Sequence, residues 1–266
     1  MDKERLNEVL TVHRKINKGR IMDSLFVFGP PPCTDHDSIL DVFIQTKINS
    51  GRTSSIPLVQ FWKEKDLHLQ ELLKNLHIKK KPQHLCFEYP TAPFNGKGYP
   101  SMTDLMFVGK DYKISLEAKF TEYKEAPDTD SVQAWLEKGE NRQYRTEVLE
   151  SWKELLRGFT EKTDFPDIGN VEYQFLHRTA SACKDVKKAY VVYQVFYDDD
   201  TKPELQGFIN KLEMWKNRLH PNEKLEFWIW TVQVEQAIPS PMIGNPFFLM
   251  KTKDVYKILS HDLRPL

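Results

Sequence analysis

A strand–helix–strand succession between residues 189 and 234 constrains the fold of this chain more than any other feature of its sequence. Residues 189–197 read AYVVYQVFY and residues 225–234 read LEFWIWTVQV. Runs so rich in β-branched and aromatic residues are typical of buried strands. Between them, residues 203–219 are predicted to form a helix with a proline near its start, where helices tolerate one. The succession predicts an α/β protein.

The N-terminal part of the chain is predicted to be mainly helical. Apolar residues recur at helical spacing over residues 38–48 and 61–76, and residues 1–25 also have a helical pattern. The prolines at 30–32 must separate the first two helices, because a helix cannot continue through them. We therefore divide the chain into a helical region, residues 1–82, and an α/β core, residues 83–266, which together are expected to form one compact unit.

The first half of the core has the alternation and turn signals of strands. Strands are predicted over residues 84–89, 103–108 and 112–120, and the last two form a hairpin around the turn at Gly109. Apolar residues then return to helical spacing, as in the stripe from Val148 to Phe159. We expect further helices in three places: a helical insertion near 132–160, and short helices over 171–185 and 254–259.

Composition restricts the class of protein. The 266 residues carry 38 basic and 38 acidic side chains, and 40% of the residues are hydrophobic, which argues against a disordered chain and against a basic protein that coats nucleic acid. The three cysteines form no C-x-x-C pair, so neither a disulfide framework nor a cysteine zinc site is predicted. With no signal-peptide pattern and no apolar run long enough to span a bilayer, we expect a cytoplasmic protein without membrane association.

The predicted hairpin brings three ionisable residues together. Side chains alternate across a strand, so Glu117 and Lys119 share one face, while Leu116 and Ala118 share the other. Asp104 begins the partner strand, and in a hairpin the start of the first strand lies opposite the end of the second. Two carboxylates and one ammonium group are therefore expected to converge at one end of the hairpin.

Such a trio suits metal-assisted hydrolysis. Carboxylate oxygens are the ligands that Mg²⁺ or Mn²⁺ prefers, which makes Asp104 and Glu117 the expected metal ligands. A bound metal polarises a phosphodiester and acidifies a bound water, while Lys119 could orient that water or stabilise the developing charge. The alternative is an exposed strand face carrying an ordinary surface ion pair.

Asp104, Glu117 and Lys119 resemble the motif of the PD-(D/E)xK nuclease superfamily, whose members share the restriction-endonuclease-like fold. An acidic residue, any residue and lysine occur in succession five times in this chain, but only Glu117–Lys119 lies within an apolar strand with an acidic residue suitably upstream. The predicted order of elements also resembles the family's αβββαβ core. The match departs from the family in that Thr103, and not proline, precedes Asp104. The resemblance implies a mixed central sheet flanked by helices and a Mg²⁺- or Mn²⁺-dependent nuclease acting on DNA more readily than RNA.

The resemblance also implies that the helix following the hairpin lies beside the active site. In the helix predicted over 171–185, Gln174, His177 and Arg178 belong to one polar stripe. By resemblance Gln174 is a catalytic candidate, and His177 and Arg178 are candidate substrate contacts; the alternative is the solvent face of an amphipathic helix. Glu88 is an additional candidate metal ligand, with an exposed strand residue as the alternative.

Two other functions remain open from the sequence. A nuclease-like fold that has lost catalysis could bind nucleic acid or protein, and an unrelated α/β hydrolase could use the acid pair without a metal. A homodimer is an expectation for the nuclease alone, because cleavage of a duplex needs two cuts.

Overall fold

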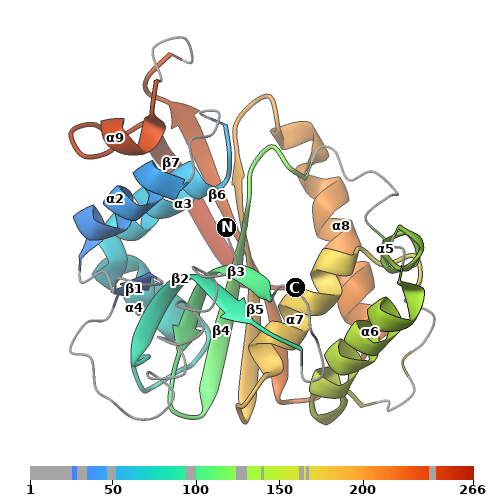
Figure 1. The fold of residues 1–266 in the computed structure, drawn as a ribbon. Helices are drawn as coiled ribbons and strands as arrows, with labels where there is room; N and C mark the ends of the chain where they lie inside the picture. The colour runs from blue at the N-terminus through green and yellow to red at the C-terminus, as the bar shows by residue number, and fades with distance from the viewer. Residues whose placement is uncertain are drawn as a thin grey trace.

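The structure is a computed structural model, and it describes residues 26–28, 35–46, 52–93, 100–123, 131–138, 141–161, 165, 168–239 and 244–266. The helix predicted over residues 1–25 lies outside these residues. Within them, seven strands form one mixed sheet whose spatial order follows the order of the chain (Figure 1). The strands are β1 (Phe26–Phe28), β2 (His84–Thr91), β3 (Ser101–Val108), β4 (Tyr112–Lys119), β5 (Lys188–Tyr197), β6 (Leu225–Gln236) and β7 (Tyr256–Pro265).

The sheet combines both kinds of strand pairing. Strands β2, β3 and β4 form an antiparallel meander, with β1 parallel to β2 at one edge. Strands β4, β5 and β6 are parallel to one another, and β7 closes the other edge antiparallel to β6. The predicted α/β architecture, a mixed sheet flanked by helices, is confirmed.

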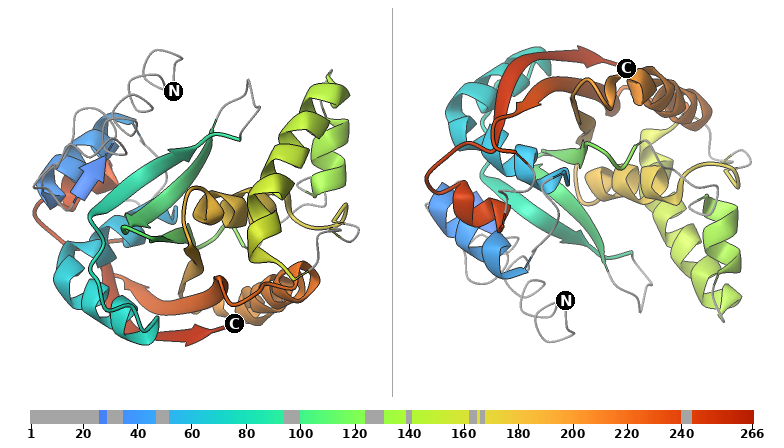
Figure 2. Two further views of the ribbon diagram at one scale, coloured as in Figure 1. Left: turned by 90° about the horizontal axis from the view of Figure 1, so that it is seen from below. Right: turned by 90° about the horizontal axis from the view of Figure 1, so that it is seen from above.

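Helices cover both faces of the sheet (Figures 1 and 2). On one face lie α2 (His36–Thr46), α3 (Ser55–Phe61), α4 (Lys65–Asn75) and α9 (Pro246–Leu249). On the other face lie α5 (Val132–Glu137), α6 (Arg142–Leu156), α7 (Tyr173–Cys183) and α8 (Lys202–Leu219). Because β1 pairs with β2 and α2–α4 pack on the same sheet, the described parts of residues 1–82 and 83–266 share one core.

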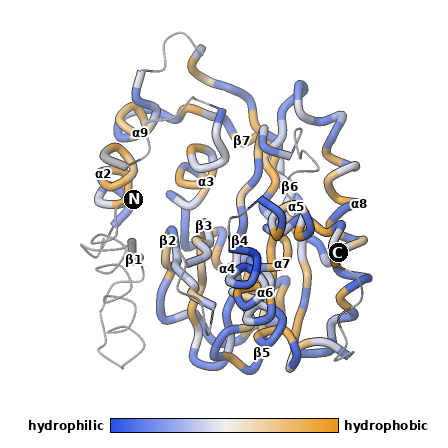
Figure 3. Tube along the Cα trace, turned by 45° about the vertical axis from the view of Figure 1, so that its right-hand side comes forward, coloured by the Kyte–Doolittle hydropathy of each residue, from blue (hydrophilic) through white to orange (hydrophobic). Residues whose placement is uncertain are grey.

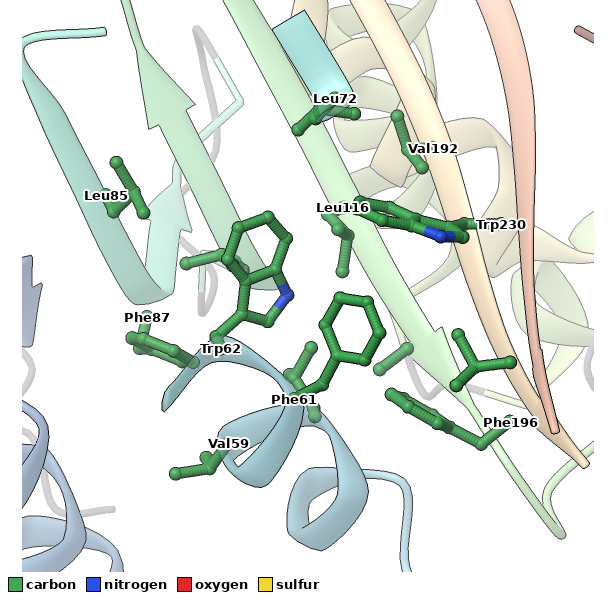
Figure 4. Close-up of a cluster of buried hydrophobic side chains, with 14 of the residues drawn as sticks. Val59, Phe61, Trp62, Leu72, Leu85, Phe87, Leu116, Val192, Phe196 and Trp230 are labelled. Atoms are coloured by element: carbon green, nitrogen blue, oxygen red, sulfur yellow. The ribbon is translucent and has the colours of Figure 1, made fainter. Parts of the chain in front are cut away.

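Alternation along the strands divides the core into two layers. Leu116 of β4 and Val192 of β5 face the first layer, where they meet Phe61 and Trp62 from the helical region (Figure 4). The residues that alternate with these along β4 and β5 point to the second layer, beneath α7 and α8. Hydrophilic and hydrophobic segments alternate along α8, as expected for a helix that covers a sheet (Figure 3).

Two predicted helices differ from the structure. The single helix predicted over residues 61–76 is divided by a 3₁₀ turn, Trp62–Glu64, and Leu67 of its predicted apolar face is 63% exposed. Phe61 and Trp62 are both fully buried at the point where α3 ends and the 3₁₀ turn begins. The prediction of a short helix over residues 254–259 is wrong: residues from Tyr256 onward form strand β7. None of the described helices has the length and apolar composition that spanning a bilayer requires.

A buried histidine in the first layer should make stability depend on pH. His68 of α4 stacks on Phe61 with ring centroids 3.6 Å apart, and burial lowers the pKa of His68 from 6.5 to about 4. The unfolded chain therefore takes up this proton first, so stability is fully present above pH 6.5 and falls as the pH drops towards 4. At about 1.4 kcal/mol per pH unit, the loss at pH 4 is roughly 3 kcal/mol.

Urea denaturation at several pH values in metal-free buffer measures this effect. We expect His68→Phe to lose most of the pH dependence between 6.5 and 4. His220→Asn is the matched control, because His220 has φ 49°, a conformation that Asn tolerates, and it should keep the wild-type slope. An unchanged slope in His68→Phe would show that another group causes acid unfolding.

Candidate active site

Strand β4 places Glu117 and Lys119 on its second-layer face. Ile114, Leu116 and Ala118 face the first layer, so Glu117 and Lys119 point to the opposite side of the sheet, towards α7. Glu117 is 2% exposed and Lys119 is 9% exposed. The alternative of a solvated strand face is therefore wrong at these two positions.

Asp104 lies at the point where β3 and β4 stop pairing through their backbones. The last β3–β4 pair at this end is Leu105 with Leu116. Beyond it, the Asp104 carboxylate accepts a hydrogen bond from the backbone N–H of Ala118 at 2.8 Å. The side chain thus continues the ladder and holds its carboxylate against the backbone between Glu117 and Lys119.

Helix α7 supplies an amide that connects the lysine and the glutamate. Gln174 Oε1 accepts a hydrogen bond from Lys119 Nζ at 2.6 Å, and Gln174 Nε2 donates to Glu117 Oε1 at 2.7 Å. Lys119 Nζ also lies 3.4 Å from the same glutamate oxygen. Gln174 therefore holds the ammonium group of Lys119 beside Glu117.

Arg178, one turn further along α7, pairs with the other oxygen of Glu117. Its Nε lies 2.6 Å from Glu117 Oε2, and its Nη1 donates to Ser101 Oγ at 2.8 Å. Ser101 Oγ in turn shares a hydrogen bond of 2.7 Å with His177 Nδ1. Arg178 is buried, so the structure places its guanidinium against Glu117 and Ser101; contact with a phosphate stays a prediction for Arg178 and for His177.

The electrostatic surroundings set the protonation states of Arg178 and His177. Burial opposes the charge of Arg178, but the Glu117 and Asp104 carboxylates outweigh it and raise the pKa of Arg178 above its ordinary value. Burial, together with the charges of Arg178 and Lys119, lowers the pKa of His177 well below 6.5. At neutral pH the site therefore contains a permanently charged guanidinium and a neutral imidazole.

Glu88 of β2 lies at a strained position beside Asp104. Its φ is 49°, in the left-handed region that non-glycine residues rarely adopt. The β2–β3 ladder pairs Phe87 with Leu105 and Tyr89 with Thr103, so Glu88 stands opposite Asp104 without a ladder pair. The Glu88 carboxylate is half-buried and contributes to the raised pKa of Arg178, which places it in the electrostatic field of the site. Backbone strain of this kind is concentrated at functional sites.

We expect Glu88→Gly to separate stability from function. Glycine adopts a positive φ without steric cost, so the free energy of unfolding should rise by up to about 1 kcal/mol. The loss of the carboxylate should at the same time weaken divalent-metal binding. Denaturant unfolding and metal titration measure the two effects. Glu88→Gln, which keeps the strain and removes the charge, should show only the second, and a destabilised Glu88→Gly would contradict the role of strain.

The donor atoms of the site fit a hard divalent ion. Glu88, Asp104 and Glu117 offer only carboxylate oxygens, the ligand type of Mg²⁺ and Mn²⁺. The structure does not bring oxygens of all three within 4.8 Å of one another. Oε1 of Glu117 already contacts two donors, whereas Oε2 lies beside Arg178 and, among the described residues, accepts no hydrogen bond. Mg²⁺ is usually held by one or two carboxylates and several waters, so Asp104 and Glu117 suffice as protein ligands.

Two further residues of the site were not among those singled out from the sequence. Ser101 bridges Arg178 and His177, and Tyr193 stands beside Glu117 in the β4–β5 register. The Tyr193 hydroxyl is fully buried and has no hydrogen-bond partner in the described residues, and burial followed by the Glu117 charge raises its pKa well above 10. The sequence did not single out Tyr193, because a tyrosine within the run AYVVYQVFY is expected to be an ordinary core residue.

Comparisons with known proteins identify a family and no function. No curated protein and no solved structure matches the chain. One family model, described as a domain of unknown function (DUF6946), matches residues 32–236, which is more than half of the chain and includes every site residue named above. The chain therefore belongs to the DUF6946 family.

Proposed function

We propose that this protein is a Mg²⁺- or Mn²⁺-dependent nuclease whose active site consists of Asp104, Glu117 and Lys119. The observation that carries the proposal is that Glu117 and Lys119 are buried on one face of β4, with the Asp104 carboxylate hydrogen-bonded to the backbone N–H between them. Ionisable side chains are seldom buried, so a buried Glu117 and Lys119 beside the half-buried Asp104 indicate a functional site.

The roles of the residues follow from their contacts. Asp104 and Glu117 would hold the ion, which when bound supplies Lewis-acid activation of the phosphodiester and of a water. Lys119 would donate a hydrogen bond to the attacking water or to the phosphate oxygen that gains charge. Gln174 keeps the Lys119 ammonium in place by accepting from it at 2.6 Å, and Arg178 holds the orientation of Glu117.

The order of elements also supports the proposal. Helix α4, strands β2, β3 and β4, helix α7 and strand β5 have the order αβββαβ, with α5 and α6 inserted between β4 and α7. This is the order to which the sequence showed its resemblance. The carboxylates come from the second and third of these strands and the amide from the second helix. DNA is the expected substrate by the same resemblance.

A cleavage assay tests the proposal. Wild-type protein with Mg²⁺ or Mn²⁺ should cleave duplex DNA, single-stranded DNA or RNA of one common sequence, and a chelator should stop the reaction. Asp104→Asn keeps an oxygen that can accept from Ala118 but loses the charge, so the rate should fall at least about 100-fold. Asp111→Asn, at the other end of the same hairpin, is the control and should leave the rate unchanged.

Comparing the three substrates tests the predicted preference for DNA, and the mass of the protein in solution tests the predicted homodimer. Preference for DNA over RNA is expected from the family resemblance, and sedimentation as a homodimer is expected because cleavage of a duplex needs two cuts. Absence of cleavage of all three nucleic acids with either ion would contradict the proposal, and chelator-resistant cleavage would favour a hydrolase without metal.

One observation favours a second candidate, a catalytically inactive module that binds nucleic acid or protein. Glu117 already contacts Lys119, Gln174 and Arg178, so its charge is compensated without any ion. In that case the protein should bind a nucleic acid or protein partner equally well with or without a chelator and cleave no nucleic acid. Asp104→Asn would then leave partner binding unchanged.

A further inference from the structure

Three potential metal ligands meet on the opposite face of the sheet from Glu117. His68 and Glu71 lie one turn apart on α4, and His261 lies on β7. One ligand atom from each lies within 4.8 Å of the other two, and in the described part of the chain no other group of three histidine, cysteine or acidic side chains does so. The cluster borders the first core layer, where His68 neighbours the ring of Trp230.

One distance within the cluster matches the spacing of coordinated ligands, and all three ligand atoms lie within 4.8 Å of one another. Glu71 Oε1 and His261 Nδ1 are 3.4 Å apart, beyond the usual 2.7–3.2 Å of a hydrogen bond. Tetrahedral Zn²⁺ with bonds of about 2.0–2.2 Å to nitrogen and oxygen separates neighbouring ligand atoms by about 3.3–3.5 Å. We propose that His68, Glu71 and His261 bind one Zn²⁺ ion, with water as the fourth ligand.

His68 supplies an independent indication. The residue is 5% exposed, and its Nδ1 is buried without a hydrogen-bond partner in the described residues. Stacking on Phe61 fixes the ring plane but satisfies neither nitrogen. A buried polar atom left unpaired costs free energy, and a neutral imidazole is the form that binds a metal. Burial lowers the pKa of His68 to about 4, so the neutral form is present at pH 7.

The cluster has an open side and a structural consequence. The side chains of Glu71 and His261 are about 30% exposed, so an ion can enter from solvent. The indole N–H of Trp230 points to His261 Nδ1 at 3.4 Å, a long contact that an ion would replace. Imidazole ligands favour Zn²⁺ over Mg²⁺, which distinguishes this cluster from the carboxylates of Asp104 and Glu117. A bound ion would join α4 to the edge strand β7.

Titration of the metal-free protein with Zn²⁺, and with Co²⁺ as a coloured tetrahedral probe, tests this proposal. We expect one ion per chain to bind with a tetrahedral Co²⁺ spectrum, apart from any ion held by the carboxylates of Asp104 and Glu117, and we expect a rise in Tm on Zn²⁺ addition. His261→Ala and Glu71→Gln should each weaken binding at least about 10-fold and abolish most of the Tm rise. Asp262→Asn, beside His261 on the same strand, should bind as wild type.

The Co²⁺ spectrum also distinguishes an ion bound at this cluster from an ion bound at the carboxylates of Asp104 and Glu117. Asp104→Asn and Glu117→Gln should keep the Co²⁺ spectrum, because their carboxylates lie on the other face of the sheet. Lack of stoichiometric Zn²⁺ binding by the wild type would overturn the proposal, and so would equal affinity in the wild type and in His261→Ala. His261→Ala changes a partly exposed side chain and should fold normally. The Tm of this variant without metal checks its folding.

Discussion

Replacing Arg178 by methionine is expected to lower the free energy of unfolding by about 3–5 kcal/mol. The guanidinium is the partner of Glu117 Oε2 at 2.6 Å, and Glu117 is only 2% exposed. Without Arg178, a buried carboxylate would lose its closest cation, and Ser101 would lose the hydrogen bond from Nη1. Methionine preserves most of the aliphatic volume, so the loss reports charge compensation more than packing.

Urea denaturation of a double-mutant cycle measures the interaction. Glu117→Gln combined with Arg178→Met should recover a large part of the stability, because the uncompensated charge is then absent. Arg157→Met is the matched control: Arg157 pairs with Glu154 on the surface, with both side chains about half exposed, and its loss should cost less than about 1 kcal/mol. A loss below about 1 kcal/mol in Arg178→Met would mean that the pair does not compensate Glu117.

Lys119→Met should reduce metal-dependent cleavage at least about 100-fold while the protein stays folded. Removing the ammonium group takes away the donor proposed to act on the water or the phosphate. Glu117 keeps its contacts with Gln174 and Arg178, so its charge remains compensated. The change should therefore greatly reduce the rate constant of cleavage and hardly change the Tm. Single-turnover cleavage and thermal unfolding measure the two quantities on the same samples.

Lys113→Met provides a matched control for the catalytic effect. Lys113 is another buried lysine of β4, but its Nζ donates to the backbone carbonyl of Lys184, away from the carboxylates. Burial lowers the pKa of Lys113 to about 8, so its loss tests the general effect of removing a buried lysine from this strand. If both variants lost cleavage equally, Lys119 would have no special part in the reaction.

Much of the candidate site could be predicted from local patterns. Alternation along a strand does not depend on its neighbours, so residues 112–120 were enough to place Glu117 and Lys119 on one face. The turn at Gly109 then set which end of β3 approaches them, and Asp104 reaches the backbone between them. Helical spacing likewise aligned Gln174 and Arg178, and both contact Glu117.

Other features left no such local pattern. The short helix predicted over residues 254–259 was wrong. Strand β7 is mostly exposed and lacks the regular alternation from which a strand is predicted, so its conformation depends on pairing with β6. The left-handed backbone of Glu88 also has no signal, because glutamate does not favour a positive φ. Ser101 and Tyr193 join the site only because α7 and β5 pack beside β3 and β4.

Local sequence patterns were enough to predict a mixed α/β fold and to place Asp104, Glu117 and Lys119 at one end of a hairpin. Both conclusions depend on periodicities within short segments, which hold wherever the segment lies. The tertiary structure alone decided that Arg178 compensates Glu117 and that His261 stands beside Glu71. These pairs join residues far apart in the chain, and their contact follows from how α7 and β7 dock on the sheet, which is set by burial of the whole core.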